Sequence, residues 1–202
     1  MNARQDKNST RRLAARALPA PEMPSPGRLW ERRLLLSILL AGAIVRLYAF
    51  PDVPPGLNQD EASSGYEAWA LLHHGVDRNG FHNPVHLVSW GSGQNALYSY
   101  MAMPFIAAFG LNTFAVRCLG LVFGLVTLVA FHRFVKSLSD ELTALCAAFL
   151  LAVSPWHIML SRWALESNLF PGIFLIATWL LVRATVAPGL LPLSFACFAV
   201  SL

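Results

Sequence analysis

Four long apolar runs, separated by short charged segments, constrain this chain more than any other feature of its sequence. They cover residues 34–50, 114–131, 142–158 and 169–182. A helix needs about 20 apolar residues to cross the hydrocarbon core of a bilayer, and these runs approach that length. Only 13% of the 202 residues are charged, which is about half the share that is usual in soluble domains. The sequence therefore predicts an all-α integral membrane protein and excludes a disordered chain, a disulfide-rich secreted domain and a nucleic-acid binder.

The net charge of +4 is concentrated at the N-terminus, where residues 1–33 carry eight basic and three acidic side chains. A basic segment before the first apolar helix is the positive-inside signal, so we predict that the N-terminus lies in the cytoplasm. The prolines of residues 1–28 predict a disordered basic tail rather than a docking surface for nucleic acid. No small-residue cleavage pattern follows residue 50, which favours an uncleaved anchor over a signal peptide.

We predict a multi-span helical bundle, a membrane domain over residues 29–202. Its spans lie at about 29–50, 114–132, 142–158 and 169–183, with a partial span at 190–202 and a large external loop at 51–113. Only about 13 residues of the last run are present, too few to cross, so we expect the chain to be truncated. Within the loop, helical spacing predicts a surface helix over 61–74, with Gly75 as its stop.

The run at 96–109 is apolar but contains Pro104 and is only about two-thirds of a span, so we predict an interfacial helix. With this choice Arg133, Lys136 and Arg183 all face the cytoplasm, as the positive-inside rule requires. In the alternative topology the run at 96–109 crosses, and Arg133 and Lys136 then face outward.

The predicted topology gathers ionisable residues at the external face, and ionisable residues at membrane boundaries are candidates for function. Each also has a structural interpretation: Asp60 as the N-cap of the loop helix, Arg162 and Glu166 as an i, i+4 ion pair, and Arg46 as a side chain that extends to the interface. The shared location is what favours a site. The set comprises Arg46, Asp60, Glu61, Arg117, Arg162 and Glu166.

Other motifs carry less information. Gly120 and Gly124 form a G-x-x-x-G, which predicts the close approach of a neighbouring helix. The pairs His73-His74 and His82/His86 lack a carboxylate at ligand spacing, so we predict no histidine metal site. We assign no cofactor, and the sequence leaves a requirement for a divalent metal open.

A resemblance gives these residues a context. It rests on the order and spacing of motifs between residues 29 and 202, and the chain resembles the N-terminal half of polyprenyl-phosphate-dependent glycosyltransferases of the GT-C superfamily. The similar group is family 39, which includes protein O-mannosyltransferases and aminoarabinose transferases. The motifs are Asp60-Glu61 with Gly65-Tyr66, Ala96-Leu97-Tyr98, Pro104, Phe109-Gly110-Leu111, Ala115-Val116-Arg117, Ser154-Pro155-Trp156-His157 and Ser161-Arg162.

The resemblance implies roles for single residues. Asp60 is the implied catalytic base, with Glu61 in support, and Arg117 and Arg162 are implied to hold the lipid phosphate. Glu166 stands where the related oligosaccharyltransferases carry an acidic motif, and Tyr66 and Arg46 complete the predicted substrate-binding set. Aminoarabinose transferases carry Glu-Lys-Pro late in this loop, whereas Gly93-Gln94-Asn95 stands here, so the resemblance does not extend to the sugar.

We therefore expect a cell-membrane glycosyltransferase that transfers a sugar from a polyprenyl-phosphate donor to an acceptor hydroxyl at the external face. Its expected partners are the lipid-linked sugar, membrane lipids and an acceptor that is a protein or a glycolipid or glycan. The alternative is a non-catalytic fragment or a subunit that binds the lipid-linked sugar. A transporter is disfavoured because the middles of two predicted spans, residues 120–129 and 144–153, are almost wholly apolar.

Overall fold

The computed structural model describes residues 26–89 and 92–201. The predicted tail over 1–28 lies almost entirely outside these residues. The described residues belong to two units, which divide between Arg33 and Leu34. In the first unit the described residues form the start of helix α2 (Pro26–Leu47).

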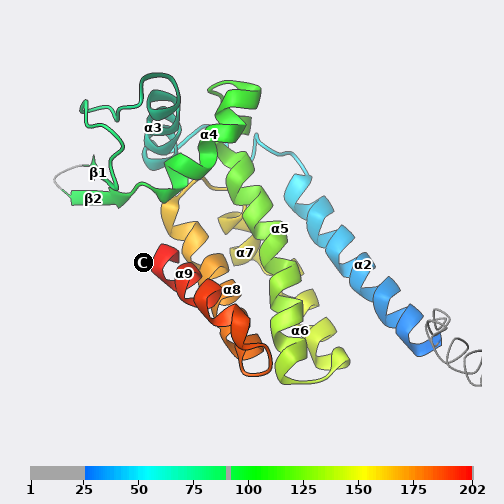
Figure 1. Cartoon of the computed structure of the whole chain (residues 1–202). Helices are drawn as coiled ribbons and strands as arrows, with labels where there is room; N and C mark the ends of the chain where they lie inside the picture. Colours follow the sequence, from blue (N-terminus) through cyan, green and yellow to red (C-terminus); the bar gives the residue numbers. More distant parts are fainter. Residues whose placement is uncertain (1–25, 90–91, 202) are drawn as a thin grey trace, which may run out of the picture. The chain divides into compact units, whose positions relative to one another are not determined.

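The second unit is mostly helical (Figure 1). After α2 come α3 (Gln59–His74) and α4 (Leu97–Phe109), then the long helix α5 (Thr113–Leu138). They are followed by α6 (Glu141–Val153), α7 (Pro155–Leu160), the 3-10 turn η1 (Glu166–Asn168) and α8 (Leu169–Ala184). The described chain ends with η2 (Pro188–Leu190) and α9 (Leu191–Ser201).

Two described helices are long and apolar enough to cross a membrane, α5 and the combined Glu166–Ala184 helix. The predicted span at 29–50 forms α2, which is not one of these two helices. At about 1.5 Å per residue, the 26 residues of α5 extend about 39 Å. The predicted interfacial run forms α4, a helix of 13 residues with Pro104 inside it. Such a helix extends only about 20 Å, so it is too short for a full crossing.

Two further segments also differ from expectation. The predicted span at 142–158 forms two helices, because Ser154 adopts an extended conformation and caps α7 while Pro155 occupies the first turn of that helix. The predicted loop contains an antiparallel hairpin, β1 (His86–Ser89) with β2 (Ser92–Asn95). The hairpin was not predicted because its second strand, Ser-Gly-Gln-Asn, has neither β-branched nor aromatic residues.

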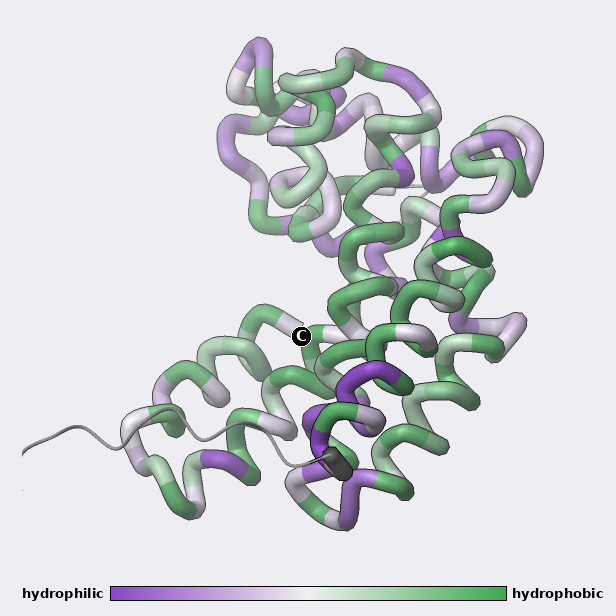
Figure 2. The backbone as a smooth tube through the Cα atoms, turned by 90° about the vertical axis from the view of Figure 1, so that its right-hand side faces the viewer, coloured by the Kyte–Doolittle hydropathy of each residue, from purple (hydrophilic) through white to green (hydrophobic). Residues whose placement is uncertain are grey.

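Helix α5 is the centre of the packing. It contacts α3, α4, α6, α7 and α8, and α9 packs on α8. One apolar cluster joins α3, α4, α5 and α8, and a second joins α2, α5 and α6. The outward faces of the helices carry exposed apolar side chains, including Leu40, Val126, Leu150, Phe174 and Phe195. Figure 2 shows the contrast between these mostly hydrophobic helices and the mixed colouring of the part that holds α3 and the hairpin.

Candidate functional site

Helix α3 is fixed at both ends by local hydrogen bonds. Its N-cap is Asn58, whose side chain accepts a hydrogen bond from the backbone of Glu61 at 2.8 Å. The Glu61 carboxylate in turn accepts from the backbone of Asn58 at 3.1 Å, which completes a capping box. Gly75 ends the helix in a left-handed conformation with φ of 67°. The structural interpretation of Asp60 as the cap is therefore wrong, since Asp60 lies in the first turn and is exposed.

A buried ion pair joins α3 to α5. Arg117 donates from Nε and from its second terminal nitrogen to the two oxygens of Glu61, at 2.8 and 2.9 Å. The exposed fractions are 0% for Arg117 and 1% for Glu61. Gly65 allows the two helices to approach, because a Cβ there would lie 2.5 Å from the Val116 side chain. A buried pair of this kind is tolerated only when its other donors and acceptors are also satisfied.

Arg117 meets this requirement through the segment that precedes α3. Its remaining donors bind the carbonyl oxygens of Pro51, Pro54 and Gly56, at 2.6, 2.7 and 2.5 Å. A guanidinium has five N–H groups, and all five have a protein acceptor here. In this arrangement Arg117 keeps no donor for the lipid phosphate that the resemblance assigned to it. It holds the chain between α2 and α3 against the start of α5.

Glu61 is equally well satisfied. Besides Arg117 and Asn58, it accepts a hydrogen bond from the backbone of Ala164 at 3.0 Å, which brings the segment after α7 to the same point. Burial alone raises the pKa of this carboxyl, but the hydrogen bonds from Arg117, Ala164 and Asn58 outweigh burial and leave the pKa below its usual value. Glu61 is therefore ionised at neutral pH.

Arg162 lies in that same segment, and the two glycines of α5 position it. A Cβ at Gly120 would lie 2.9 Å from the carbonyl oxygen of Trp163, and one at Gly124 would lie 2.2 Å from the Cβ of Ser161. The packing predicted for the G-x-x-x-G is thus present, although the partner is the turn after α7 rather than the body of a helix.

The guanidinium of Arg162 binds the end of α2 and the segment beyond it. It donates to the carbonyls of Val53 and Ala49 at 2.8 and 2.9 Å, and at 3.5 Å to that of Val45. Burial and the nearby Arg117 lower the pKa of Arg162. Three of its five N–H groups have an acceptor among the described residues. No ion pair joins it to Glu166 in the described part of the chain.

Arg46 does not extend to an interface, because its side chain is fully buried. It donates to the carbonyls of Gly42 and Ala152 at 2.9 and 3.0 Å and contacts Nδ1 of His157 at 2.7 Å. These contacts join α2 to α6 and α7. Arg46 therefore contacts both sides of the break at Ser154.

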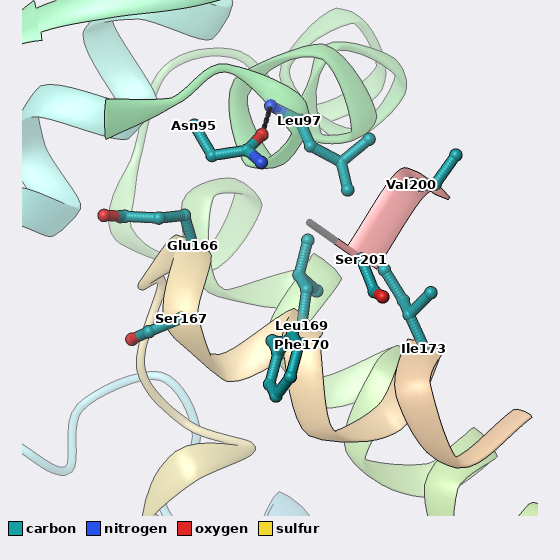
Figure 3. Close-up of a pocket in the computed structure, with 9 residues that line it drawn as sticks. All are labelled: Asn95, Leu97, Glu166, Ser167, Leu169, Phe170, Ile173, Val200 and Ser201. Atoms are coloured by element: carbon teal, nitrogen blue, oxygen red, sulfur yellow. Dashed lines mark hydrogen bonds between the residues drawn. The ribbon is translucent and has the colours of Figure 1, made fainter. Parts of the chain in front are cut away.

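Glu166 occupies a different place, at the edge of a cavity of about 160 Å³ between the start of α4, the start of α8 and the end of α9. Figure 3 shows its carboxylate pointing away from the apolar side chains of Leu97 and Ile173. Asn95, at another edge, accepts a hydrogen bond from the backbone of Leu97 at 2.8 Å. The cavity thus combines an apolar interior with polar groups at its rim.

Tyr66 lies on the exposed face of α3 and stacks on Trp69, with ring centroids 5.9 Å apart. It borders a polar groove of about 460 Å³ together with Gln59, Ser63, Arg78 and Asn79. Arg78 is a residue that sequence reasoning missed. It forms an ion pair with the buried Glu67 and hydrogen bonds to Ser63. Eleven residues separate Glu67 from Arg78, across the end of α3, so no helical spacing signals this pair.

The structure therefore brings Glu61, Arg117 and Arg162 together, with Asp60 exposed beside them in the first turn of α3. Arg46, Glu166 and Tyr66 have surroundings of their own. A scan against protein-family models, a search of curated proteins and a search of solved structures each find no match.

Proposed function

We propose that this chain is a membrane-embedded glycosyltransferase that uses a polyprenyl-phosphate sugar. The observation that carries the proposal is the buried Glu61–Arg117 pair, which fixes α3 so that Asp60 is held at its exposed first turn. The motif resemblance names the same Asp-Glu dipeptide. An exposed carboxylate on a rigid support suits a base that must meet an acceptor from outside the protein.

Membrane placement is part of this proposal, and the exposed apolar faces of the helices support it. The arrangement of basic residues supports the predicted topology as well. Arg133 and Lys136 near the end of α5 line one groove with Arg183 near the end of α8. Both helices therefore run in the same direction, and all three cations lie at the same end, as the positive-inside rule requires of cytoplasmic residues. The Glu61–Arg117 pair lies near the opposite end of α5.

The proposed reaction is a displacement at the anomeric carbon of the donor. The acceptor oxygen forms the new glycosidic bond, its proton passes to the carboxylate of Asp60, and the bond between the anomeric carbon and the phosphate oxygen breaks. The polyprenyl phosphate leaves with both electrons of that bond. Glu61 and Arg117 act as positioning residues, because their polar atoms are used within the protein.

Arg162 is the residue that binds the phosphate of the donor lipid in this proposal. It is the guanidinium of the cluster with two N–H groups that have no acceptor among the described residues. A guanidinium remains charged and can bind a phosphate through two parallel hydrogen bonds. It therefore suits a leaving group whose negative charge grows in the transition state.

The test is sugar transfer by the full chain in reconstituted bilayers, with release of polyprenyl phosphate as the readout. Asp60→Asn removes the base but keeps the size of the side chain, so we expect transfer to fall by about 100-fold to 10,000-fold. Binding of the donor lipid should be unchanged. Asp52→Asn, an exposed acid of the same loop, is the matched control and should transfer at the wild-type rate.

A subunit that binds the lipid-linked sugar without catalysis is the second candidate. The observation in its favour is that no described residue donates a hydrogen bond to the side chain of Asp60, so the carboxylate has no orienting partner of the kind that catalytic bases often have. Donor binding by the wild-type chain without any transfer would select this candidate.

A further inference from the structure

A basic groove lies between the C-terminal ends of α5 and α8. Its volume is about 560 Å³, and its lining includes Arg133, Lys136 and Ser137 from α5 and Trp179 and Arg183 from α8. None of these residues has a part in the proposed reaction. The groove is also separate from the cavity at Glu166, since the two share no lining residue.

The charge of this groove is not compensated by its own lining. Three of the lining residues are cations and none is an acid. Among the described residues Lys136 has an acidic partner, Glu141, which also binds His132 at 3.0 Å. No described acid pairs with Arg133 or Arg183. Like charges held together repel, and an anion between the two arginines removes this repulsion.

The residues that line the groove and its position indicate which anion binds there. Two guanidinium groups favour a phosphate, because each can bind two of its oxygens. Trp179 adds the amphipathic ring that is enriched where a membrane meets water. The groove stands at the ends of the two helices that are long and apolar enough to cross a membrane. A phosphate at that level is the phosphate of a lipid headgroup.

We propose that Arg133, Arg183 and Lys136 bind the headgroup phosphate of an anionic phospholipid in the leaflet at the basic ends of α5 and α8. The inference rests on the membrane placement proposed above, but not on glycosyl transfer. Basic pockets between membrane helices are suited to such headgroups because the nearby leaflet supplies the anion at high local concentration.

The experiment measures lipid binding by the full chain in nanodiscs of phosphatidylcholine, without sugar donor or acceptor. Short-chain phosphatidylglycerol is added, and quenching of tryptophan fluorescence by a brominated form of this lipid reports its binding. Arg133→Gln with Arg183→Gln should weaken binding by at least about 10-fold, since one lost charge-assisted hydrogen bond of about 1.4 kcal/mol gives that factor. Arg32→Gln, at an exposed arginine outside the groove, should bind as the wild type does.

Three outcomes would contradict the inference. Unchanged binding in the double variant would show that the groove is not the site, provided that its melting temperature without the anionic lipid equals that of the wild type. If the double variant fails to fold, Arg183→Lys is used instead; it should weaken binding measurably but by less than 10-fold, because the charge remains while the paired hydrogen bonds of the guanidinium are lost, and unchanged binding would contradict the inference. Competition by inorganic phosphate at the same concentration as the lipid would identify a site for free phosphate. A chain that does not insert into bilayers would overturn the inference together with the membrane placement, whereas loss of sugar transfer alone would not affect it.

Discussion

At the level of single residues, Arg117 holds the candidate site together entirely through contacts within the protein. Its five N–H groups bind Glu61 and three carbonyls of the preceding segment. The sequence predicted that Glu61 and Arg117 lie in one region, because the predicted topology places both residues at the external face. It could not predict that they bind each other, because 56 residues separate them and no local spacing records a contact of that length.

Substitution of Glu61 by Gln tests this pair. Arg117 would then remain buried without its counter-ion, and breaking one side of a buried pair costs about 3–5 kcal/mol. We expect a loss of stability of that size in chemical unfolding of the detergent-solubilised chain. Asp60→Asn, one residue away and exposed, should change stability by no more than about 0.5 kcal/mol. A wild-type stability in Glu61→Gln would contradict the structural role of the pair.

The pH dependence of stability follows from the same carboxyl. Its pKa is below the usual value of 4.5 in the folded chain, so the folded state binds the proton less tightly than the unfolded state. The contribution of ionised Glu61 to the stability of the fold is therefore complete above about pH 4.5. It is lost as the pH falls through the lower pKa of the folded state. Thermal unfolding between pH 3 and pH 7 measures it. The fall in melting temperature at acid pH should be smaller in Glu61→Gln than in the wild type. An identical fall in both would contradict the role of the Glu61 carboxylate.

At the scale of elements, two features position the site. They are the capping box of α3 and the glycines of α5. The sequence predicted helix 61–74 and its stop at Gly75, because apolar spacing and a terminal glycine are local signals. It missed the start by two residues, since Asp60 and Asn58 are about equally good caps by residue type. The break at Ser154 was also missed, because the residues on both sides are apolar and continue one run.

The capping assignment predicts a difference between two alanine variants. Asn58→Ala removes the side chain that accepts from Glu61 and should destabilise the chain by about 1 kcal/mol. Asp60→Ala removes no cap and should leave the melting temperature close to that of the wild type. The reverse order of the two melting temperatures would restore Asp60 as the cap.

The glycines of α5 predict a second difference. Gly124→Ala places a methyl group 2.2 Å from the Cβ of Ser161, so the turn that carries Arg162 must move. Overpacking of this kind costs about 1–3 kcal/mol. Gly189→Ala is the control, since nothing lies within 4 Å of a Cβ there. Equal unfolding midpoints for the two variants would show that the turn does not depend on close approach to α5.

At the scale of the second unit, the two ends of α5 differ in character. One end carries the buried cluster of Glu61, Arg117 and Arg162, and the other carries the basic groove. The sequence predicted this difference between the two ends, because hydropathy and the charge of loops are properties of whole segments and need no knowledge of contacts. Two of its predicted spans, 114–132 and 169–183, coincide with the helices that are long and apolar enough to cross a membrane. It could not anticipate the cavities, because they depend on contacts between helices far apart in the chain.

The proposed topology is tested most directly by the accessibility of these two ends from each side of a membrane. Single cysteines replace Ser92, in the hairpin, and Ser139, at the end of α5, in a chain whose Cys118, Cys146 and Cys197 are replaced by alanine. Both serines are exposed, so a difference in labelling reports the side of the membrane. We expect an impermeant thiol reagent added to intact cells to label the cysteine at 92. The same reagent should label the cysteine at 139 only after the membrane is permeabilised. Labelling of the cysteine at 139 in intact cells would contradict the proposed topology.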